Sequence, residues 1–204
     1  MLLFFDTETT SLDIKHGQIC QLSYIMADTQ NKSVTAKNFY FTVESMDPGA
    51  EAVHKLSMDI LKQYSKGETF RDNIDEIFKD FNNADLIIGH NVAFDMRYIK
   101  AEFSRCNKAL GEKKTFCSML YYTDIVKTPG KNGKYKWPKL EEAVNFMGIT
   151  NEEADKYTKK FFGTYTGYHD SRFDIASTYL LIKKGIEKGY MEKGYLTERA
   201  EYGF

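Results

Sequence analysis

Two acidic side chains lie two residues apart near the start of the chain. Asp6 and Glu8 follow the apolar run 2–5, which is typical of a buried β-strand. Residues two apart on a strand project to the same face, so these carboxylates are predicted to lie side by side. They repel each other unless a divalent cation binds them, and carboxylate oxygens suit Mg²⁺ or Mn²⁺. A D-x-E pattern by itself is more typical of an ordinary polar strand end than of a metal site.

A third carboxylate is predicted to approach this pair from a helix. The segment HNVAFD (90–95) follows the apolar run 85–89, a second buried strand, and begins a helix expected over 93–105. Asp95 would lie on the first turn of that helix and face the strand edge that carries Asp6. His90 by itself is more typical of a structural residue than of a catalytic one.

A fourth carboxylate and a histidine come late in the chain, in HDSRFD (169–174). If a helix begins near Asp170, Asp174 lies just over one turn into it and His169 lies at its looser edge. A rigid carboxylate suits a metal ligand, whereas a mobile imidazole suits a proton acceptor. Asp170 is the other candidate for the metal ligand on this helix, but a role as N-cap is enough to explain an aspartate at position 170.

The elements that position these residues follow from hydrophobic periodicity. Strands expected at 2–5, 19–26 and 38–43 would form an antiparallel meander. Helices are expected over 70–81, 93–105, 140–147 and 170–184. Residues 127–139 hold two of the three prolines and are predicted to be a basic surface loop. Trp137 of this loop is expected to anchor it by packing, in preference to contacting a base. Without a Pro/Gly/Ser-rich linker, the chain predicts a single α/β domain over 1–204.

The charge is segregated along the chain although its net value is only −1. Residues 97–139 carry 11 Lys or Arg against 3 acids, while residues 1–96 carry 8 against 15. A basic segment beside an acidic one suits a protein that binds phosphates near its carboxylates. Lysine-rich segments are also commonly plain solvated surfaces, so the charge alone decides nothing.

Several classes of protein are excluded by missing patterns. The chain lacks the P-loop, the G-x-S-x-G elbow of hydrolases and the H-E-x-x-H of zinc proteases. Its three cysteines form no C-x-x-C, which favours a reducing, cytoplasmic compartment. No signal peptide is recognised, and no run approaches the roughly 18 apolar residues of a membrane span, so no membrane contact is expected.

In this order and with these gaps, FFDTETTSL (4–12), HNVAFD and HDSRFD resemble the three motifs of the DEDDh exonucleases. This DnaQ-like group acts from 3′ to 5′ and is related to the proofreading subunit of bacterial replicative DNA polymerase. The resemblance spans residues 2–182 and leaves 185–204 as a C-terminal tail. It implies a ribonuclease H-like α/β fold, in which helices flank a five-stranded mixed sheet made of an antiparallel meander and then strand-helix units. Ser11 stands where the family usually has Gly, and Ser171 stands where it usually has Ala. Neither position is a metal ligand in the family.

The resemblance also implies roles for individual residues. It makes four acids the ligands of two divalent ions, Mg²⁺ or Mn²⁺, namely Asp6, Glu8, Asp95 and Asp174. It makes His169 the general base. It places a second group beside the terminal nucleotide, with Leu12 as a wedge: Thr9, Thr10, Leu12, His90, Asn91 and Phe94. Leu12 and Phe94 suit the protein core equally well. The charge count adds three loop lysines as phosphate ligands, Lys131, Lys134 and Lys136.

The function expected from the resemblance is hydrolysis of DNA from its 3′ end, with release of nucleoside monophosphates. The substrate would be a single-stranded or frayed end, and a DNA polymerase is a candidate partner. An exoribonuclease is the main alternative, because no motif reveals a contact to a 2′-hydroxyl. A polymerase-associated binding module is a third reading, and the complete set of five catalytic residue types argues against it.

Overall fold

The computed structural model describes the backbone of residues 1–202 and the side chains of residues 1–198. One five-stranded sheet forms its centre, in the order β3-β2-β1-β4-β5. The strands are β1 (Leu2–Thr9), β2 (Ile19–Asp28), β3 (Ser33–Tyr40), β4 (Leu86–Gly89) and β5 (Thr115–Cys117). β1, β2 and β3 pair antiparallel, while β4 runs parallel to both β1 and β5. This mixed sheet confirms the predicted fold class.

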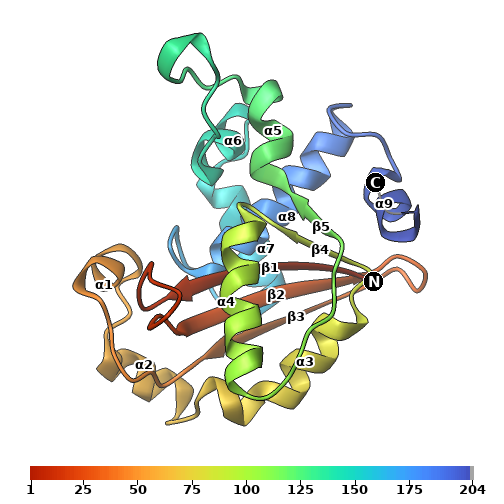
Figure 1. The fold of residues 1–204 in the computed structure, drawn as a ribbon. Coiled ribbons are helices and arrows are strands. Elements are labelled where there is room, and N and C mark those ends of the chain that lie inside the picture. The colour runs from red at the N-terminus through yellow and green to blue at the C-terminus, as the bar shows by residue number, and fades with distance from the viewer. Residues whose placement is uncertain (203–204) are drawn as a thin grey trace.

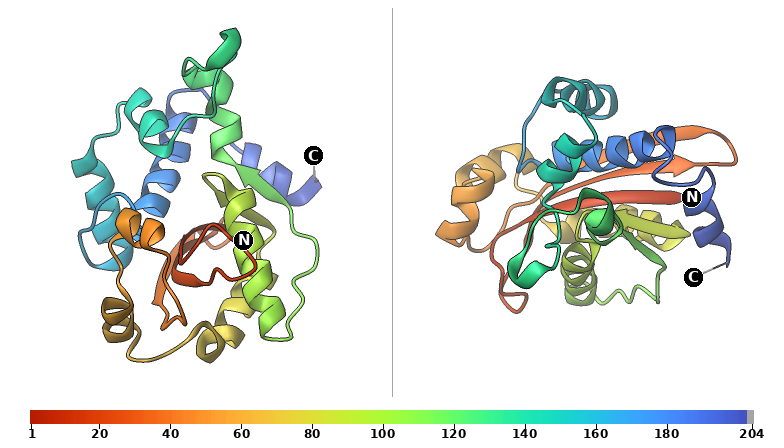
Figure 2. Two further views of the ribbon diagram at one scale, coloured as in Figure 1. Left: turned by 60° about the vertical axis from the view of Figure 1, so that its left-hand side comes forward. Right: turned by 90° about the horizontal axis from the view of Figure 1, so that it is seen from above.

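Helices cover both faces of the sheet (Figure 1). In chain order, the helices before β5 are α1 (Pro48–His54), α2 (Met58–Ser65), η1 (Phe70–Asn73), α3 (Ile74–Asn83) and α4 (Val92–Arg105). The helices after β5 are α5 (Ser118–Val126), η2 (Lys131–Gly133), α6 (Leu140–Phe146), α7 (Asn151–Phe162), α8 (Ser171–Glu187) and α9 (Tyr195–Tyr202). Seen from above in Figure 2, α7 and α8 lie on one side of the sheet and α3 and α4 on the other. Within residues 1–202, no helix has both the length and the apolar character needed to cross a lipid bilayer.

The alternation of side chains along β1 determines where its acids lie. Leu3 and Phe5 are fully buried in a cluster with side chains of α3 and α4. Phe4 is buried in a second cluster, which contains Ile175 and Ile182 of α8. Because successive strand residues point to opposite faces, Asp6 and Glu8 continue the line of Phe4 and face α8. Burial of both faces explains why residues 2–5 are uniformly apolar.

The structure corrects several predicted elements. The third strand covers Ser33–Tyr40, not 38–43, because the turn after β2 sets its pairing with Asp28 opposite Ser33. In that turn the Asp28 carboxylate accepts hydrogen bonds from the backbone N–H groups of Gln30 and Asn31, both at 3.0 Å. Trp137 is 64% exposed, so the prediction that it anchors the loop by packing is wrong. α8 continues to Glu187, and Leu196 of α9 is buried beneath it.

Other predictions of local structure are confirmed. The helix expected over 93–105 is α4, and the helix expected over 140–147 is α6. Asp170 is the N-cap of α8, where its side chain accepts a hydrogen bond from the Arg172 backbone N–H. The loop 127–139 contains only the short η2 and one bridge between Pro129 and Tyr135, and it projects from the molecule in both Figure 1 and Figure 2.

Candidate active site

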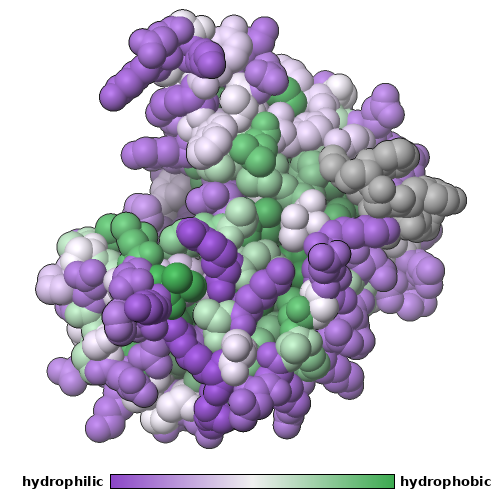
Figure 3. Space-filling view, viewed as in Figure 1, coloured by the Kyte–Doolittle hydropathy of each residue, from purple (hydrophilic) through white to green (hydrophobic). Residues whose placement is uncertain are grey.

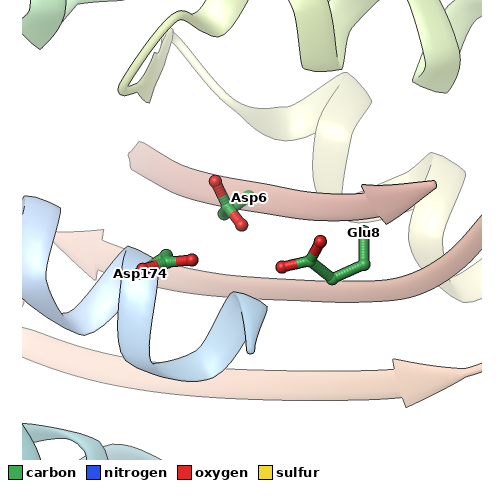
Figure 4. Close-up of side chains that lie close together, drawn as sticks. All are labelled: Asp6, Glu8 and Asp174. Atoms are coloured by element: carbon green, nitrogen blue, oxygen red, sulfur yellow. The ribbon is translucent and has the colours of Figure 1, made fainter. Parts of the chain in front are cut away.

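Three carboxylates meet where β1 passes the first turn of α8. One ligand oxygen from each of Asp6, Glu8 and Asp174 lies within 4.8 Å of the others. Figure 4 shows the three side chains turned toward one another, two from the strand and one from the helix. The N-cap at Asp170 starts α8 so that Asp174 lies one turn inside it, opposite the strand. The structure thus brings together three of the four predicted metal ligands.

The electrostatics of this cluster favour a bound cation. Burial, reinforced by the neighbouring carboxylates, raises the pKa of Asp6 and of Glu8 well above the ordinary range. Burial likewise raises the pKa of Asp174 to about 7. Within the described side chains, none of these acids forms an ion pair with a lysine, an arginine or a histidine. Oxygen donors that repel one another and have no cationic partner suit a hard divalent ion.

The fourth acid, Asp95, lies beside this cluster but outside it. It is 4% exposed on the first turn of α4, and burial raises its pKa to about 7. Its Oδ1 accepts hydrogen bonds from the Thr7 hydroxyl at 2.6 Å and from the Thr7 backbone N–H at 3.2 Å. Asp95 is close enough to Asp6 to raise the pKa of that acid. Thr7 therefore fixes Asp95 next to the three-acid cluster, a role that the motifs alone do not indicate.

His169 lies at the open edge of the site. Its side chain is exposed and its backbone is left-handed, with φ of 66°. Its backbone N–H donates to Asp174 Oδ2 at 3.1 Å, which fixes the main chain, while the imidazole forms no hydrogen bond with the side chains of residues 1–198. Asp170 is occupied elsewhere, because its carboxylate binds the Arg172 guanidinium at 2.6 Å and Gln21 Nε2 at 3.0 Å. The interpretation of Asp170 as a structural residue is therefore confirmed.

Two pockets flank the acids. The first, which we call the apolar pocket, has a volume of about 350 Å³ and opens beside Glu8. Its remaining lining comes from the end of β1, from α1 and from α4, and includes Thr9, Leu12, Val53, His54 and Phe94. Leu12 is 84% exposed, so it lies at the surface and not in the core. In Figure 3, hydrophobic side chains gather over α1 and the segment after β1.

The second pocket, which we call the polar pocket, has a volume of about 200 Å³ on the side of the loop 127–139. Its lining residues are Asp6, His90, Lys139, Leu140, Glu141, Tyr168, His169 and Asp174. The Tyr168 hydroxyl is buried without a hydrogen-bond partner in the described part of the chain. Burial raises the pKa of Tyr168 to about 12, so this hydroxyl stays protonated and remains a hydrogen-bond donor.

The predicted substrate residues are distributed unevenly over these pockets. Thr9, Leu12 and Phe94 line the apolar pocket, and His90 lines the polar pocket. Thr10 is 1% exposed and lines neither, and Asn91 is the left-handed residue before α4. The loop lysines 131, 134 and 136 also line neither pocket, and Lys136 is paired with Glu142 at 2.6 Å.

Sequence reasoning missed several pocket residues. Val53, His54, Glu141 and Tyr168 carry no motif that would single them out. Lys139 belonged to the predicted basic loop but was not distinguished from its neighbours. Its position directly before α6 could have distinguished Lys139 from the other loop lysines, because the last residue of a loop is held in place by the helix that follows it.

Comparison with known proteins shows the family to which the chain is similar. The exonuclease family model RNase_T matches residues 3–179. The epsilon subunit of DNA polymerase III from Buchnera aphidicola is 28% identical over 141 residues, which cover 64% of this chain and 58% of that protein. The epsilon subunit from Rickettsia felis is 32% identical over 111 residues, covering 52% of this chain and 46% of that protein. The chain spans about half the length of these curated relatives.

Solved structures show the same fold. Escherichia coli Exonuclease I in complex with a dA16 oligonucleotide superposes with a TM-score of 0.71 at 17% identity. The match covers 91% of this chain and 40% of that protein. At this identity the likeness establishes the fold alone, an architecture in which helices flank a mixed sheet.

Proposed function

The chain belongs to the exonuclease family, as the match over residues 3–179 shows, and from this membership we propose that it hydrolyses DNA from the 3′ end. The family confirms the resemblance carried by the three motifs. The cluster of Asp6, Glu8 and Asp174 supports the activity, because buried acids with raised pKa values and no cationic partner among the side chains of residues 1–198 suit divalent ions. We propose two Mg²⁺ or Mn²⁺ ions, with Asp95 completing the set of ligands.

The chemistry requires a nucleophile, a stabilised phosphoryl group and a protonated leaving group. Bound divalent ions would neutralise charge on the phosphate and on the leaving oxygen. His169 would accept a proton from the attacking water, since imidazole can do so near neutral pH. The water oxygen then bonds to phosphorus, the bond from phosphorus to the 3′-oxygen of the preceding nucleotide breaks, and that oxygen takes up a proton. The product is a nucleoside 5′-monophosphate.

Substrate orientation follows from the two pockets. The apolar pocket has walls of Leu12, Val53 and Phe94 and is larger than the polar one, so it suits the nucleoside that is to be released. The polar pocket continues from the acids on the other side and suits the remaining strand. Apolar walls contact any base, so we expect little dependence on base sequence. His169 stands on the polar side, next to the phosphate that is hydrolysed.

The decisive experiment is digestion of matched, end-labelled single-stranded DNA, duplex DNA and RNA. Each substrate is incubated with Mg²⁺, with Mn²⁺ and with EDTA. We expect stepwise shortening from the 3′ end of single-stranded DNA, abolished by EDTA and by Asp6→Asn. Full activity in EDTA would exclude the metal-dependent mechanism. Faster digestion of RNA than of DNA would assign the chain to exoribonucleases.

A further inference from the structure

The polar pocket is lined by a lysine whose ammonium group forms no ion pair with the side chains of residues 1–198. Lys139 lines this pocket together with Asp6, His169 and Asp174. Among the described side chains, no hydrogen bond or ion pair involves Lys139 Nζ, whereas Lys136 of the same loop is bound to Glu142 Oε1 at 2.6 Å. Lys139 therefore lines the same pocket as the reacting groups with a cationic side chain that forms no ion pair among the described residues.

The backbone around Lys139 is held from both directions. The Lys139 backbone N–H donates to Glu142 Oε2 at 2.8 Å, inside the first turn of α6. The preceding carbonyl, that of Pro138, lies 3.0 Å from His90 Nε2, and the Pro138 side chain is buried. This carbonyl can only accept, so His90 Nε2 carries the hydrogen.

His90 is itself fixed in one tautomer. Burial lowers the pKa of His90 to about 4, so the ring is neutral at physiological pH. With its hydrogen on Nε2, Nδ1 accepts from the Ser118 hydroxyl at 2.9 Å. Ser118 begins α5 directly after β5, so the contact runs from the sheet through His90 to Pro138. The end of an otherwise projecting loop is in this way tied to the ends of β4 and β5.

The order of the pockets indicates which phosphate Lys139 can reach. The proposed function places the released nucleoside in the apolar pocket and the hydrolysed phosphate at Asp6, Glu8 and Asp174, between the pockets. The strand that remains must then enter the polar pocket. Its first sugar follows the reacting phosphate, and the next charged group is the adjacent phosphate. Lys139 lines this pocket and can bind that phosphate, because an ammonium binds phosphate as a point charge.

We propose that Lys139 binds the phosphate one nucleotide to the 5′ side of the phosphate being hydrolysed, and that His90 is a positioning residue for it. This proposal rests on the proposed function. It differs from the assignment of the loop lysines 131, 134 and 136, because Lys139 acts inside the pocket and on the first phosphate beyond the reacting one.

Two dinucleotides isolate this contact. Thymidylyl thymidine, dTpdT, contains only the phosphate to be hydrolysed, whereas 5′-phosphorylated pdTpdT adds the phosphate assigned to Lys139. We expect Lys139→Gln to raise the KM for pdTpdT about fivefold, the upper range for an exposed ion pair. The KM for dTpdT should change by less than twofold. Lys139→Arg should restore most of the preference for pdTpdT, and Lys127→Gln, an exposed lysine of the same loop, is the matched control.

The positioning role of His90 has its own test. His90→Ala should raise the KM for pdTpdT as Lys139→Gln does, and the double variant should be no worse than the more impaired single one, because both act on one contact. Additive effects would overturn the role of His90. Equal losses for both dinucleotides, or no loss for either with Lys139→Gln, would overturn the role of Lys139.

Binding without turnover separates this proposal from the proposed function. The two dinucleotides are titrated in EDTA against the parent protein and Lys139→Gln, and binding is followed by NMR. A preference of the parent for pdTpdT that Lys139→Gln removes supports the phosphate contact, even if no substrate is hydrolysed. A parent without this preference contradicts it. Failure to hydrolyse any oligonucleotide with Mg²⁺ or Mn²⁺ would instead contradict the proposed function.

Discussion

Buried carboxylates that repel one another oppose folding whenever they are charged. Burial raises the pKa of Asp95 and Asp174 to about 7, and Asp6 and Glu8 are raised well above the ordinary range. An acid with a higher pKa in the folded state destabilises the protein increasingly as pH rises from its unfolded value toward its folded one. The contribution of Asp95 and Asp174 to the stability of the folded state is therefore present below about pH 4 and is lost as the pH rises to about 7. Asp6 and Glu8 act in the same direction, because their pKa values are raised as well.

The first prediction concerns the metal-free protein. In EDTA, the free energy of unfolding should fall from pH 5 to pH 8, by about 1.4 kcal/mol for each unit of pKa shift that is titrated. Mg²⁺ should reduce this fall because it binds the charged form. Denaturant unfolding at several pH values measures it, with Asp174→Asn as the variant that should show a shallower fall. Parallel curves for parent and variant in EDTA would contradict the repulsion.

The second prediction separates the histidine from the acids. His169→Ala should lower kcat by about 10²–10⁴-fold, the usual contribution of a general base, while metal affinity stays close to that of the parent. The exposed imidazole is outside the three-acid cluster that we propose as the metal site. Asp174→Ala should weaken metal binding itself. Calorimetric titration with Mn²⁺ compares them, and equal loss of metal affinity in the two variants would show that His169 is a ligand.

At the scale of elements, a short stretch at the start of α8 controls two functional groups. Asp170 caps the helix, and its carboxylate also binds Arg172 and Gln21. His169 precedes the cap, and Asp174 follows it by one turn. Any change in where α8 begins therefore moves both the proposed proton acceptor, His169, and one acid of the three-acid cluster, Asp174.

The third prediction follows from this arrangement. Asp170→Ala should cost about 1–2 kcal/mol of stability through the missing cap and should lower kcat more than Ser171→Ala does. Asp170→Asn can still cap the helix, so it should keep most of the stability. Chemical denaturation and steady-state kinetics provide the two readouts. Unchanged kcat in Asp170→Ala would show that His169 and Asp174 are held in place by other contacts.

Local signals in the sequence account for some elements better than others. α4 was predictable because two apolar pairs, Phe94 with Tyr98 and Ile99 with Phe103, are each four residues apart, and β4 because it is a short buried run. β5 has only three residues, and β3 begins with the exposed residues Ser33 and Val34, so neither has a local hydrophobic pattern. Their positions depend on pairing with β4 and β2, which is long-range information.

At the scale of the whole molecule, the motifs predicted which residues meet but not what surrounds them. Spacing on β1 was enough to place Asp6 beside Glu8, and Asp174 joined them through the position of α8. The hydrogen bonds from Thr7 to Asp95 and the entry of Lys139 into the polar pocket depend on how β1 packs on α4 and on how the loop returns. These contacts join residues that are far apart in the sequence and share no recognisable pattern, so only the folded chain reveals them.

The basic segment gives the last prediction. Lys131 and Lys134 are exposed, and their ammonium groups form no ion pair with the described residues, on a loop that projects from the molecule near the polar pocket. Phosphates of a long strand that leaves this pocket would pass along the loop. Binding of each phosphate by a lysine releases counterions, so the affinity depends on salt concentration and not on base sequence.

Replacing Lys131, Lys134 and Lys136 together by Gln should raise the KM for long single strands. The slope of log KM against log salt concentration should become shallower by roughly 0.7 for each phosphate that the loop no longer binds. The KM for pdTpdT, which is too short to reach the loop, should stay at the parental value. The control replaces Lys32, Lys79 and Lys193 by Gln, which removes the same charge from exposed lysines elsewhere in the structure. If both triple variants change the salt slope equally, the effect is one of net charge, and the strand leaves the polar pocket without touching the loop.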